Sequence, residues 1–479
     1  MNYSIIFYIL GWILNFEAAF MALPCIVAIL YQESAGWSFI ISMAICLSIG
    51  TLLVLRRPKN QVFYLKEGFV TVSLSWIVLS IMGSLPFLFS GAIANPVDAM
   101  FETVSGFTTT GASILKDVEA LPYSVLFWRS FTHWIGGMGV LVFVLTLLPL
   151  AGGYHMNLMR AESPGPSVSR LVPKVRSTAK ILYGIYIGMT IIEIILLLLG
   201  KMPLFDALTT AFGTAGTGGF GIKNSSIAGY SPYLQNVVTV FMILFGVNFN
   251  VYFLIISGRI VQAFKSEELR YYLVIIGASI LFITMNIKES FQSIGEALHH
   301  SAFQVASIIT TTGFATADFD QWPEVSKTIL VMLMFVGACA GSTGGGIKVS
   351  RLVIMIKTVK KELGQYLHPQ LVRKVTVDKR VVDHEVVRSV NVFMVAYVLI
   401  FSFSVLLIGF DKHDLITNFT AVAATFNNIG PGLEVVGPSQ NFSVFSDGAK
   451  LVLIFDMLAG RLEIFPMLLL LVRDTWRKF

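Results

Sequence analysis

A short glycine-centred segment occurs four times along this chain. The four glycines, which follow one another at intervals of 108, 94 and 117 residues, are Gly111, Gly219, Gly313 and Gly430. Twelve positions before them stand the small or polar residues Ala99, Ala207, Ser301 and Asn418. Glycine beside Thr or other small residues lets backbone carbonyls turn toward an axis, where a ring of carbonyls can replace the hydration shell of a cation. The repeat predicts that one chain supplies four walls of an ion filter.

Each filter wall is predicted to be four residues long, with the glycine third. The second wall departs from the first and third, because Gly218 stands where they have Thr. A single glycine segment would more often indicate close helix packing, which is the role we assign to Gly136, Gly137 and Gly139. The candidate filter residues are Thr109, Thr110, Gly111, Ala112, Thr217, Gly218, Gly219, Phe220, Thr311, Thr312, Gly313, Phe314, Asn428, Ile429, Gly430 and Pro431.

The composition is that of an integral membrane protein. Hydrophobic residues make up 55% of the chain and charged residues only 13%, with a mean hydropathy of +0.76, whereas soluble domains carry about 25% charged residues. A membrane-spanning helix needs about 20 apolar residues. We predict ten spans, at 5–30, 37–55, 71–91, 122–149, 179–200, 234–262, 271–287, 327–359, 389–409 and 448–472.

The distribution of basic residues predicts the orientation of these spans. Of the 34 Lys and Arg residues, 25 fall on the side opposite the filter segments and seven on the filter side. Positive loops stay in the cytoplasm, so the filters are expected to face outward from the cytoplasmic (inner) membrane, with both termini in the cytoplasm. The net charge of +6 is divided among five loops, which disfavours nucleic-acid binding.

Each filter segment follows a stretch too short to cross the membrane. The half-length pore helices are predicted at 98–107, 206–213, 296–309 and 415–426, with their negative dipole ends toward the cavity below the filter. The fold class is therefore an all-α polytopic membrane protein with four parallel span, pore-helix, filter and span repeats around one pseudo-fourfold pore. The expected division is 1–66 (N-terminal helix pair), 67–160, 161–266, 267–385 and 386–479 (pore repeats 1 to 4).

These motifs resemble the Trk/Ktr/HKT superfamily of potassium transporters over nearly the whole chain, and most closely the Trk-type membrane subunit. The resemblance implies potassium uptake, with potassium bound at the filter residues, and four filter glycines imply selectivity for potassium over sodium. The motifs that carry it are Phe127-Trp128-Arg129, Trp134 to Gly139, the four filters, Gly337 to Gly346, Asn427 to Gly432 and Gly460 to Phe465.

A run with five glycines interrupts the predicted span 327–359. Each glycine costs about 1 kcal/mol against Ala in a helix, so we predict a broken helix. In the family such a segment is an intramembrane gate below the filter. A phosphate-binding loop is disfavoured, because Ile347 displaces Lys348 from the required position and no strand precedes. The candidate gate residues are Gly337, Gly341, Ser342, Thr343, Gly344, Gly345, Gly346 and Arg461.

Arg461 is included among the candidate gate residues because a charged side chain at membrane depth is a functional candidate by default. The resemblance places Arg461 below the filter as an electrostatic barrier, and the alternative is a structural pair with Glu463 or Asp456. Arg129 is expected to be structural. For Glu102 we expect a hydrogen-bonded structural role, with ion attraction at the pore mouth as the alternative.

Other chemistry is disfavoured by the same sequence. His133, His299 and His300 lack a second ligand at metal spacing and are expected to pack or to line the mouth. We find no catalytic constellation and expect neither an enzyme nor an organic cofactor. Two other transport classes stay open: the potassium-binding subunit of an ATP-driven pump, and a symporter coupled to sodium or protons.

The long basic loop 360–388 is a candidate docking surface, and its alternative role is to hold anionic membrane lipid. The resemblance implies a homodimer that sits on a cytosolic nucleotide-binding regulatory ring. The loop residues considered for docking are Lys361, Arg373, Lys374, Lys379, Arg380, Asp383, His384 and Glu385.

Overall fold

The computed structural model describes residues 1–58, 64–139, 175–368, 370 and 373–477, with 175–179 described as backbone alone. Within these residues, six helices are long and apolar enough to cross a membrane. Several hydroxyls inside them are satisfied locally: in α3, for example, Ser75 and Ser80 donate to carbonyls four residues earlier. The six are α1 (Tyr3–Leu30), α2 (Gly36–Leu55), α3 (Leu65–Phe89), α8 (Val175–Leu199), α13 (Glu267–Ile287) and α17 (His384–Ile408).

The other four predicted spans are interrupted within the described residues. The break in the span 327–359 was predicted, whereas the breaks in 122–149, 234–262 and 448–472 were not. Residues 140–149 of the span 122–149, and the predicted boundary at 160/161, lie outside the described residues. Within the described residues, the helices in these stretches are α5 (Tyr123–Gly137), α10 (Pro232–Phe245), α11 (Phe249–Ile256), α12 (Ile260–Phe264), α15 (Glu324–Val336), α16 (Val349–Leu367), α19 (Asp447–Arg461) and α20 (Phe465–Leu471).

Local backbone features mark three of these breaks. The predicted break over 337–346 is present, between the end of α15 and the start of α16. Between α10 and α11 the chain bends by 91°, and the Asn248 side chain caps the new helix by accepting from the N–H of Asn250. After α19, Glu463 and Ile464 adopt left-handed φ values of 57° and 71°, which end the helix.

The four predicted pore helices are present and short. Three of them begin at a side-chain cap, in which Asn95, Ser293 or Asp414 accepts a backbone N–H of the first turn. The remaining one follows Pro203. The helices are α4 (Pro96–Phe107), α9 (Leu204–Gly216), α14 (Ile294–Ile309) and α18 (Leu415–Phe426).

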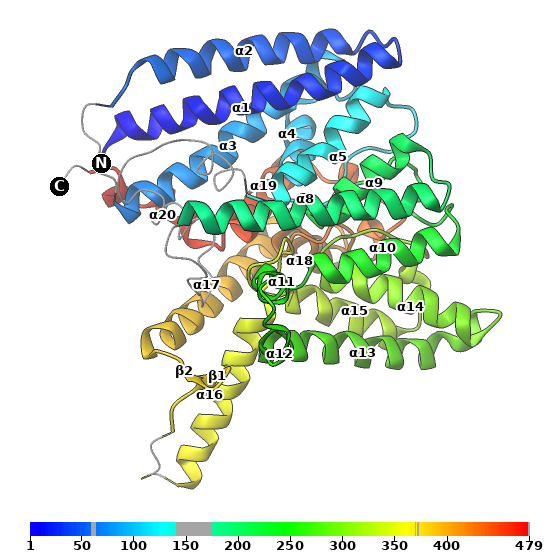
Figure 1. The fold of residues 1–479 in the computed structure, drawn as a ribbon, viewed down its shortest axis with the longest axis vertical. Helices are drawn as coiled ribbons and strands as arrows, with labels where there is room; N and C mark the ends of the chain where they lie inside the picture. Colours follow the sequence, from blue (N-terminus) through cyan, green and yellow to red (C-terminus); the bar gives the residue numbers. More distant parts are fainter. Residues whose placement is uncertain (59–63, 140–174, 369, 371–372, 478–479) are drawn as a thin grey trace.

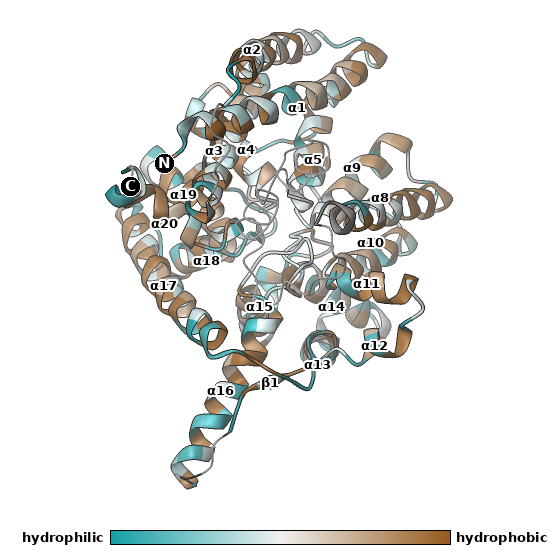
Figure 2. Ribbon diagram, turned by 60° about the vertical axis from the view of Figure 1, so that its left-hand side comes forward, coloured by the Kyte–Doolittle hydropathy of each residue, from teal (hydrophilic) through white to brown (hydrophobic). Residues whose placement is uncertain are grey.

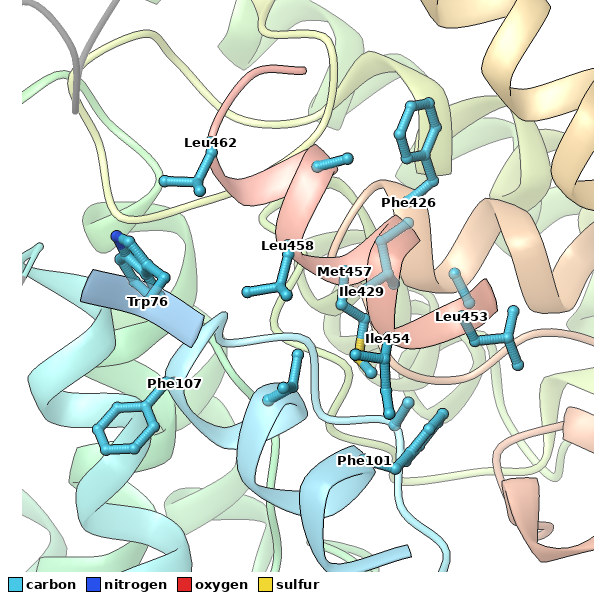
Figure 3. Close-up of a cluster of buried hydrophobic side chains, with 14 of the residues drawn as sticks. Trp76, Phe101, Phe107, Phe426, Ile429, Leu453, Ile454, Met457, Leu458 and Leu462 are labelled. Carbon is cyan, nitrogen blue, oxygen red and sulfur yellow. The ribbon is translucent and has the colours of Figure 1, made fainter. Parts of the chain in front are cut away.

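The helices surround a centre of irregular chain, where the segments that follow the pore helices meet (Figure 2). The pair α1 and α2 lies together at one edge, against α3 (Figure 1). Helix α4 packs against α19, which joins the early and late parts of the chain; Phe101 and Phe107 of α4 share a buried cluster with Met457 and Leu458 of α19 (Figure 3).

Apolar side chains cover the outside of the body, as expected for a protein in lipid. On α8, Ile191, Ile192 and Ile195 are each half exposed, and outward helices are largely hydrophobic in Figure 2. The chain is an integral membrane protein.

Helix α16 and the hairpin of β1 (Thr376–Val377) and β2 (Arg380–Val381) project from this body (Figure 1). Short 3-10 turns complete the fold: η1 (Lys288–Ser290), η2 (Phe319–Gln321), η3 (Gly409–Asp411), η4 (Glu434–Val436), η5 (Phe442–Val444) and η6 (Arg473–Thr475).

Candidate ion filter and gate

All four pore helices end in the same turn. The first residue of each wall is left-handed, with φ between 54° and 59° at Thr109, Thr217, Thr311 and Asn428. The N–H of the next residue then donates five residues back, over 2.8 to 2.9 Å, as Thr110 does to Ser105. This is the hydrogen bonding of a Schellman motif. Left-handed Thr is uncommon, and within the described residues the three Thr with positive φ are Thr109, Thr217 and Thr311 of these walls. The turns use backbone N–H groups, so the walls can offer their carbonyls to a cation.

The four filter glycines and four carbonyls close a ring. A methyl group built on Gly111 would overlap the carbonyl oxygen of Gly218; one on Gly219 would overlap that of Thr312, and one on Gly313 that of Ile429. A methyl group on Gly430 would lie 2.9 Å from the carbonyl oxygen of Thr110. Each glycine therefore abuts the residue before the next filter glycine, and the fourth wall returns to the first. The structure thus brings the predicted filter segments together at one place.

Side chains behind the ring also join its walls. The Asn428 amide donates to the hydroxyl of Thr110 and to the carbonyl of Met457, each over 2.9 Å. In the first and third walls, a pair of Thr hydroxyls lies 2.8 Å apart, Thr108 with Thr110 and Thr310 with Thr312. These side chains are fully buried, so the hydroxyls point into protein and satisfy one another there.

Glu102 and Arg129 form a buried ion pair beside the first two walls. The Arg129 Nε atom lies 2.5 Å from a Glu102 oxygen, and the two residues are 3% and 1% exposed. Glu102 also accepts from the backbone N–H of Ile114, while Arg129 donates to the carbonyl of Gly221 and stacks over the Phe220 ring at 3.7 Å. This geometry favours the structural role expected for both residues over ion attraction at the mouth.

The Gly-rich loop between α15 and α16 lies against the ends of the third and fourth pore helices. A methyl group on Gly345 would overlap the carbonyl oxygen of Asn427, and one on Gly344 would lie 2.8 Å from that of Thr310. The N–H of Gly345 donates to the Thr311 hydroxyl over 2.6 Å. The loop therefore touches the first residue of the third wall and lies next to that of the fourth.

Three left-handed glycines shape this loop: Gly337, Gly341 and Gly346 have φ values from 71° to 77°. Backbone bonds fasten the loop to the bend between α10 and α11, because the N–H of Cys339 donates to Gly246 and the N–H of Phe249 donates to Gly341, each over 3.0 Å. The break in α15–α16 and the bend in α10–α11 therefore support each other.

Arg461 connects the Gly-rich loop with α5. One of its terminal nitrogens donates to the carbonyl of Thr343 over 2.8 Å, and the other donates to the carbonyl of Gly136 over 2.6 Å. The two carboxylates considered as its partners have other contacts: Glu463 forms an ion pair with Arg351 of α16, and Asp456 accepts from the Ser404 hydroxyl over 2.7 Å. Arg461 lies at the last residue of α19, not inside a continuous helix.

Gly136 and Gly137 serve close packing, as predicted. A methyl group on Gly136 would overlap the carbonyl of Phe107, and one on Gly137 would lie 2.6 Å from the Cα of Gly216. Gly460 has the matching position on α19, where a methyl group would overlap the carbonyl of Phe426. Small residues at these points let the following helices pass directly beneath the pore helices.

The basic loop 360–388 forms the end of α16, the β1–β2 hairpin and the start of α17. Arg373, Lys374, Lys379 and Arg380 are exposed there. Lys357 of α16 pairs with Glu267 of α13 and donates to the carbonyl of Thr376, which fixes the base of this segment to the membrane body. Residues 369, 371 and 372 lie outside the description.

Several side chains contact the site without having been singled out by their spacing. The Glu268 carboxylate accepts from the N–H of Ala340 in the Gly-rich loop over 2.6 Å. The His133 ring is fully buried and contacts Gly106 at the end of α4 and Phe220 in the second wall, which favours the packing role over the mouth-lining role that was its alternative. No local pattern identifies these partners, because they are 27 to 87 residues apart in the sequence.

Comparisons with known proteins agree with this architecture. A family model described as "TrkH: Cation transport protein" matches residues 35–477. The chain is 36% identical over 486 residues to the Trk system potassium uptake protein TrkH of Salmonella typhimurium, covering 100% of both chains. It is 33% identical to TrkG of Escherichia coli K12, covering 98% of this chain and 97% of the relative. The crystal structure of the potassium transporter TrkH from Vibrio parahaemolyticus superimposes with a TM-score of 0.90, at 35% identity and 100% coverage of both chains. The chain therefore belongs to the TrkH family of cation transport proteins.

Proposed function

We propose that this chain mediates potassium uptake across the cytoplasmic membrane, through a filter made of the sixteen wall residues. The observation that carries the proposal is the closed ring in which each filter glycine abuts a carbonyl of the next wall. Four converging walls of carbonyls suit a dehydrated monovalent cation. The family and the names of its relatives, which are potassium uptake proteins, support potassium as that cation.

In this proposal the Gly-rich loop 337–346 and Arg461 form the gate. The support is their location: the loop contacts Thr311, the first residue of the third filter wall, and Arg461 holds the loop through Thr343. A positive charge at that point opposes a passing cation, and displacement of the loop would open the path. The four-repeat division, with an N-terminal pair at 1–66, is part of the proposal.

The proposed orientation has the filters outward and both termini in the cytoplasm, on the strength of the positive loops. The relatives are components of a Trk system, so we propose a homodimer that docks on a cytosolic nucleotide-binding ring. The exposed basic residues of the hairpin segment would form the docking surface. Replacing Arg373, Lys374, Lys379 and Arg380 by Ala should then abolish ring binding in a pull-down with purified subunits, without altering the size-exclusion profile.

The direct test is electrical recording of the purified protein in a bilayer under two ionic gradients. Uncoupled potassium flux predicts a reversal potential at the potassium equilibrium value in both gradients. A reversal potential that follows the sodium or proton gradient would instead support the symporter, and flux that requires ATP would support the pump subunit. Protein-free bilayers serve as the control.

A further inference from the structure

The second filter wall lacks a side chain that the other three walls have. Thr110, Thr312 and Ile429 precede the filter glycine in the first, third and fourth walls, whereas Gly218 occupies this position in the second. The space is nevertheless filled. A methyl group built on Gly218 would overlap the Nδ1 and Cγ atoms of the His133 imidazole. His133 therefore stands where the missing side chain would be.

The hydrogen bonds of His133 define its chemical state. The ring is fully buried on α5, with Nδ1 2.8 Å from the carbonyl oxygen of Gly106 and Nε2 3.3 Å from the backbone nitrogen of Phe220. A carbonyl can only accept and an amide N–H can only donate. Nδ1 must therefore carry the hydrogen and Nε2 must accept, which is a neutral imidazole with both ring nitrogens in use.

These two bonds join neighbouring walls. The Gly106 carbonyl also accepts from the N–H of Thr109, the left-handed residue that opens the first wall. Phe220 closes the second wall, and its ring lies 4.2 Å from the His133 ring, centroid to centroid. The imidazole thus bridges the start of the first wall and the end of the second.

Arg129 acts on the same wall from a different point. It lies one helical turn before His133 on the same face of α5, and it donates to Gly221 and stacks on Phe220. Arg129 reaches residues after the filter glycine, while the contact with Gly218 belongs to His133. The two side chains are therefore not interchangeable supports.

We propose that His133 is a positioning residue for ion selectivity, in which the neutral imidazole takes the place of the side chain that Gly218 lacks and fixes the second wall against the first. This inference rests on the proposed potassium function. It explains why the second wall tolerates glycine at a position where the others do not have it. It also implies that the size of residue 218 is matched to the side chain at position 133. The effect of a larger residue at position 218 should therefore be corrected by a smaller residue at position 133, and the reverse.

The experiment is a two-residue exchange, read as the ratio of sodium to potassium permeability in liposomes. His133→Ala removes the support and both of its hydrogen bonds, and it should raise this ratio about fivefold, a change equivalent to roughly 1 kcal/mol. Gly218→Thr alone overlaps the imidazole and should raise it as well. The double variant, His133→Ala with Gly218→Thr, places a Thr side chain in the space that the imidazole leaves. The Thr hydroxyl then lies near the point from which Nδ1 donates to Gly106, so the permeability ratio should return to within about twofold of wild type.

A purely structural His133 would lower the thermal unfolding temperature and leave the permeability ratio unchanged, which would overturn the proposal. So would a double variant no better than the worse single variant. If His133→Ala is not monodisperse, His133→Asn keeps the donor at the Nδ1 position and loses the acceptor, so its ratio should fall between wild type and fivefold; a wild-type ratio there also overturns the idea. The matched control is His300→Ala, because His300 contacts Thr316, a residue outside the four filter walls.

The same data separate this inference from the proposed function. A wild-type protein without preference for potassium over sodium would reject potassium selectivity. The pairing of His133 with Gly218 would then still be judged by thermal unfolding, in which the double variant should recover the stability that either single variant loses. Failure of that recovery, in a potassium-selective wild type, rejects the positioning role alone.

Discussion

The carbonyl oxygen of Gly218 occupies the space that a side chain on Gly111 would need. Residues 107 positions apart therefore define one contact of the filter ring, and the first wall cannot gain a Cβ without moving the second. Gly111 is also left-handed, with φ of 80°, a conformation that disfavours any other residue. Both facts make this glycine a fixed point of the ring.

We expect Gly111→Ser to relax the discrimination of potassium over sodium, because the added Cβ displaces the carbonyl of Gly218. The measurement is the sodium to potassium permeability ratio in liposomes. Gly91→Ser is a suitable control, since Gly91 has a similar φ of 73° but nothing within 4 Å of the added atom. A Gly111→Ser ratio equal to that of wild type would mean that the filter alignment is wrong.

The Gly-rich loop allows a second prediction. Replacing Gly344, Gly345 and Gly346 by Ala should change open probability, because the new methyl groups would overlap Asn427 and crowd Thr310 and Gly337. Steric contact with the pore-helix ends adds to the gain of about 1 kcal/mol per site in helix propensity. Single-channel recording should show altered gating with ion preference retained.

The matched control for this triple variant is Ala at Gly184, Gly188 and Gly277, three glycines within long helices where an added methyl group meets nothing within 4 Å. Its gating should equal that of wild type. Altered selectivity with unaltered gating in the loop variant would assign the loop to the filter and not to a gate.

The buried pair of Glu102 and Arg129 predicts an effect on stability. Arg129→Met leaves a buried carboxylate uncompensated, which typically costs about 3 to 5 kcal/mol. We expect a clearly lower thermal unfolding temperature. The measurement is the loss of the monodisperse size-exclusion peak after heating of the protein in detergent. Adding Glu102→Gln removes the unpaired charge and should recover part of the loss. Asp474→Asn breaks the exposed pair with Arg477 and should have no measurable effect. A single variant as stable as wild type would contradict the structural role.

The short helices were the most predictable part of the fold. For α18 the predicted and observed limits are both 415 and 426, and α14 ends at Ile309 in both. The signals are local: Asp414 and Ser293 are N-caps, and a Gly-containing turn ends each helix. The glycine run at 337–346 predicted the break between α15 and α16 for an equally local reason.

Other features depend on contacts between distant residues, and no local pattern contains them. The bend before Phe249 is supported by the carbonyl of Gly341, and the end of α19 lies where Arg461 meets Gly136 and Thr343. Hydropathy counted these segments as single spans because most of their residues are apolar. Glu463 similarly forms its ion pair with Arg351 on α16. Its closeness to Arg461 in the sequence had suggested Arg461 as the partner. The roles of the individual filter and gate residues stay predictions.

The last prediction concerns Arg461 and distinguishes the effect of its positive charge from the effect of its hydrogen bonds to two carbonyls. Two unit charges about 4 Å apart interact by about 4 kcal/mol at an effective dielectric near 20, and water in the pore must reduce the effect on a passing cation. The same guanidinium holds two carbonyls, of Thr343 and Gly136, with separate nitrogens. Arg461→Ala removes both the barrier and this connection, so tracer rubidium uptake should rise.

Arg461→Lys keeps the charge but loses the planar fork that reaches both carbonyls. A pure electrostatic barrier predicts uptake near that of wild type, whereas a latch on the gate loop predicts uptake between the wild-type and Ala values; the two carbonyl contacts favour the intermediate value. Uptake is compared in liposomes at equal amounts of monodisperse protein. A well-folded Ala variant with uptake at or below wild type would refute both roles, because neither a barrier nor a latch can be removed without raising flux.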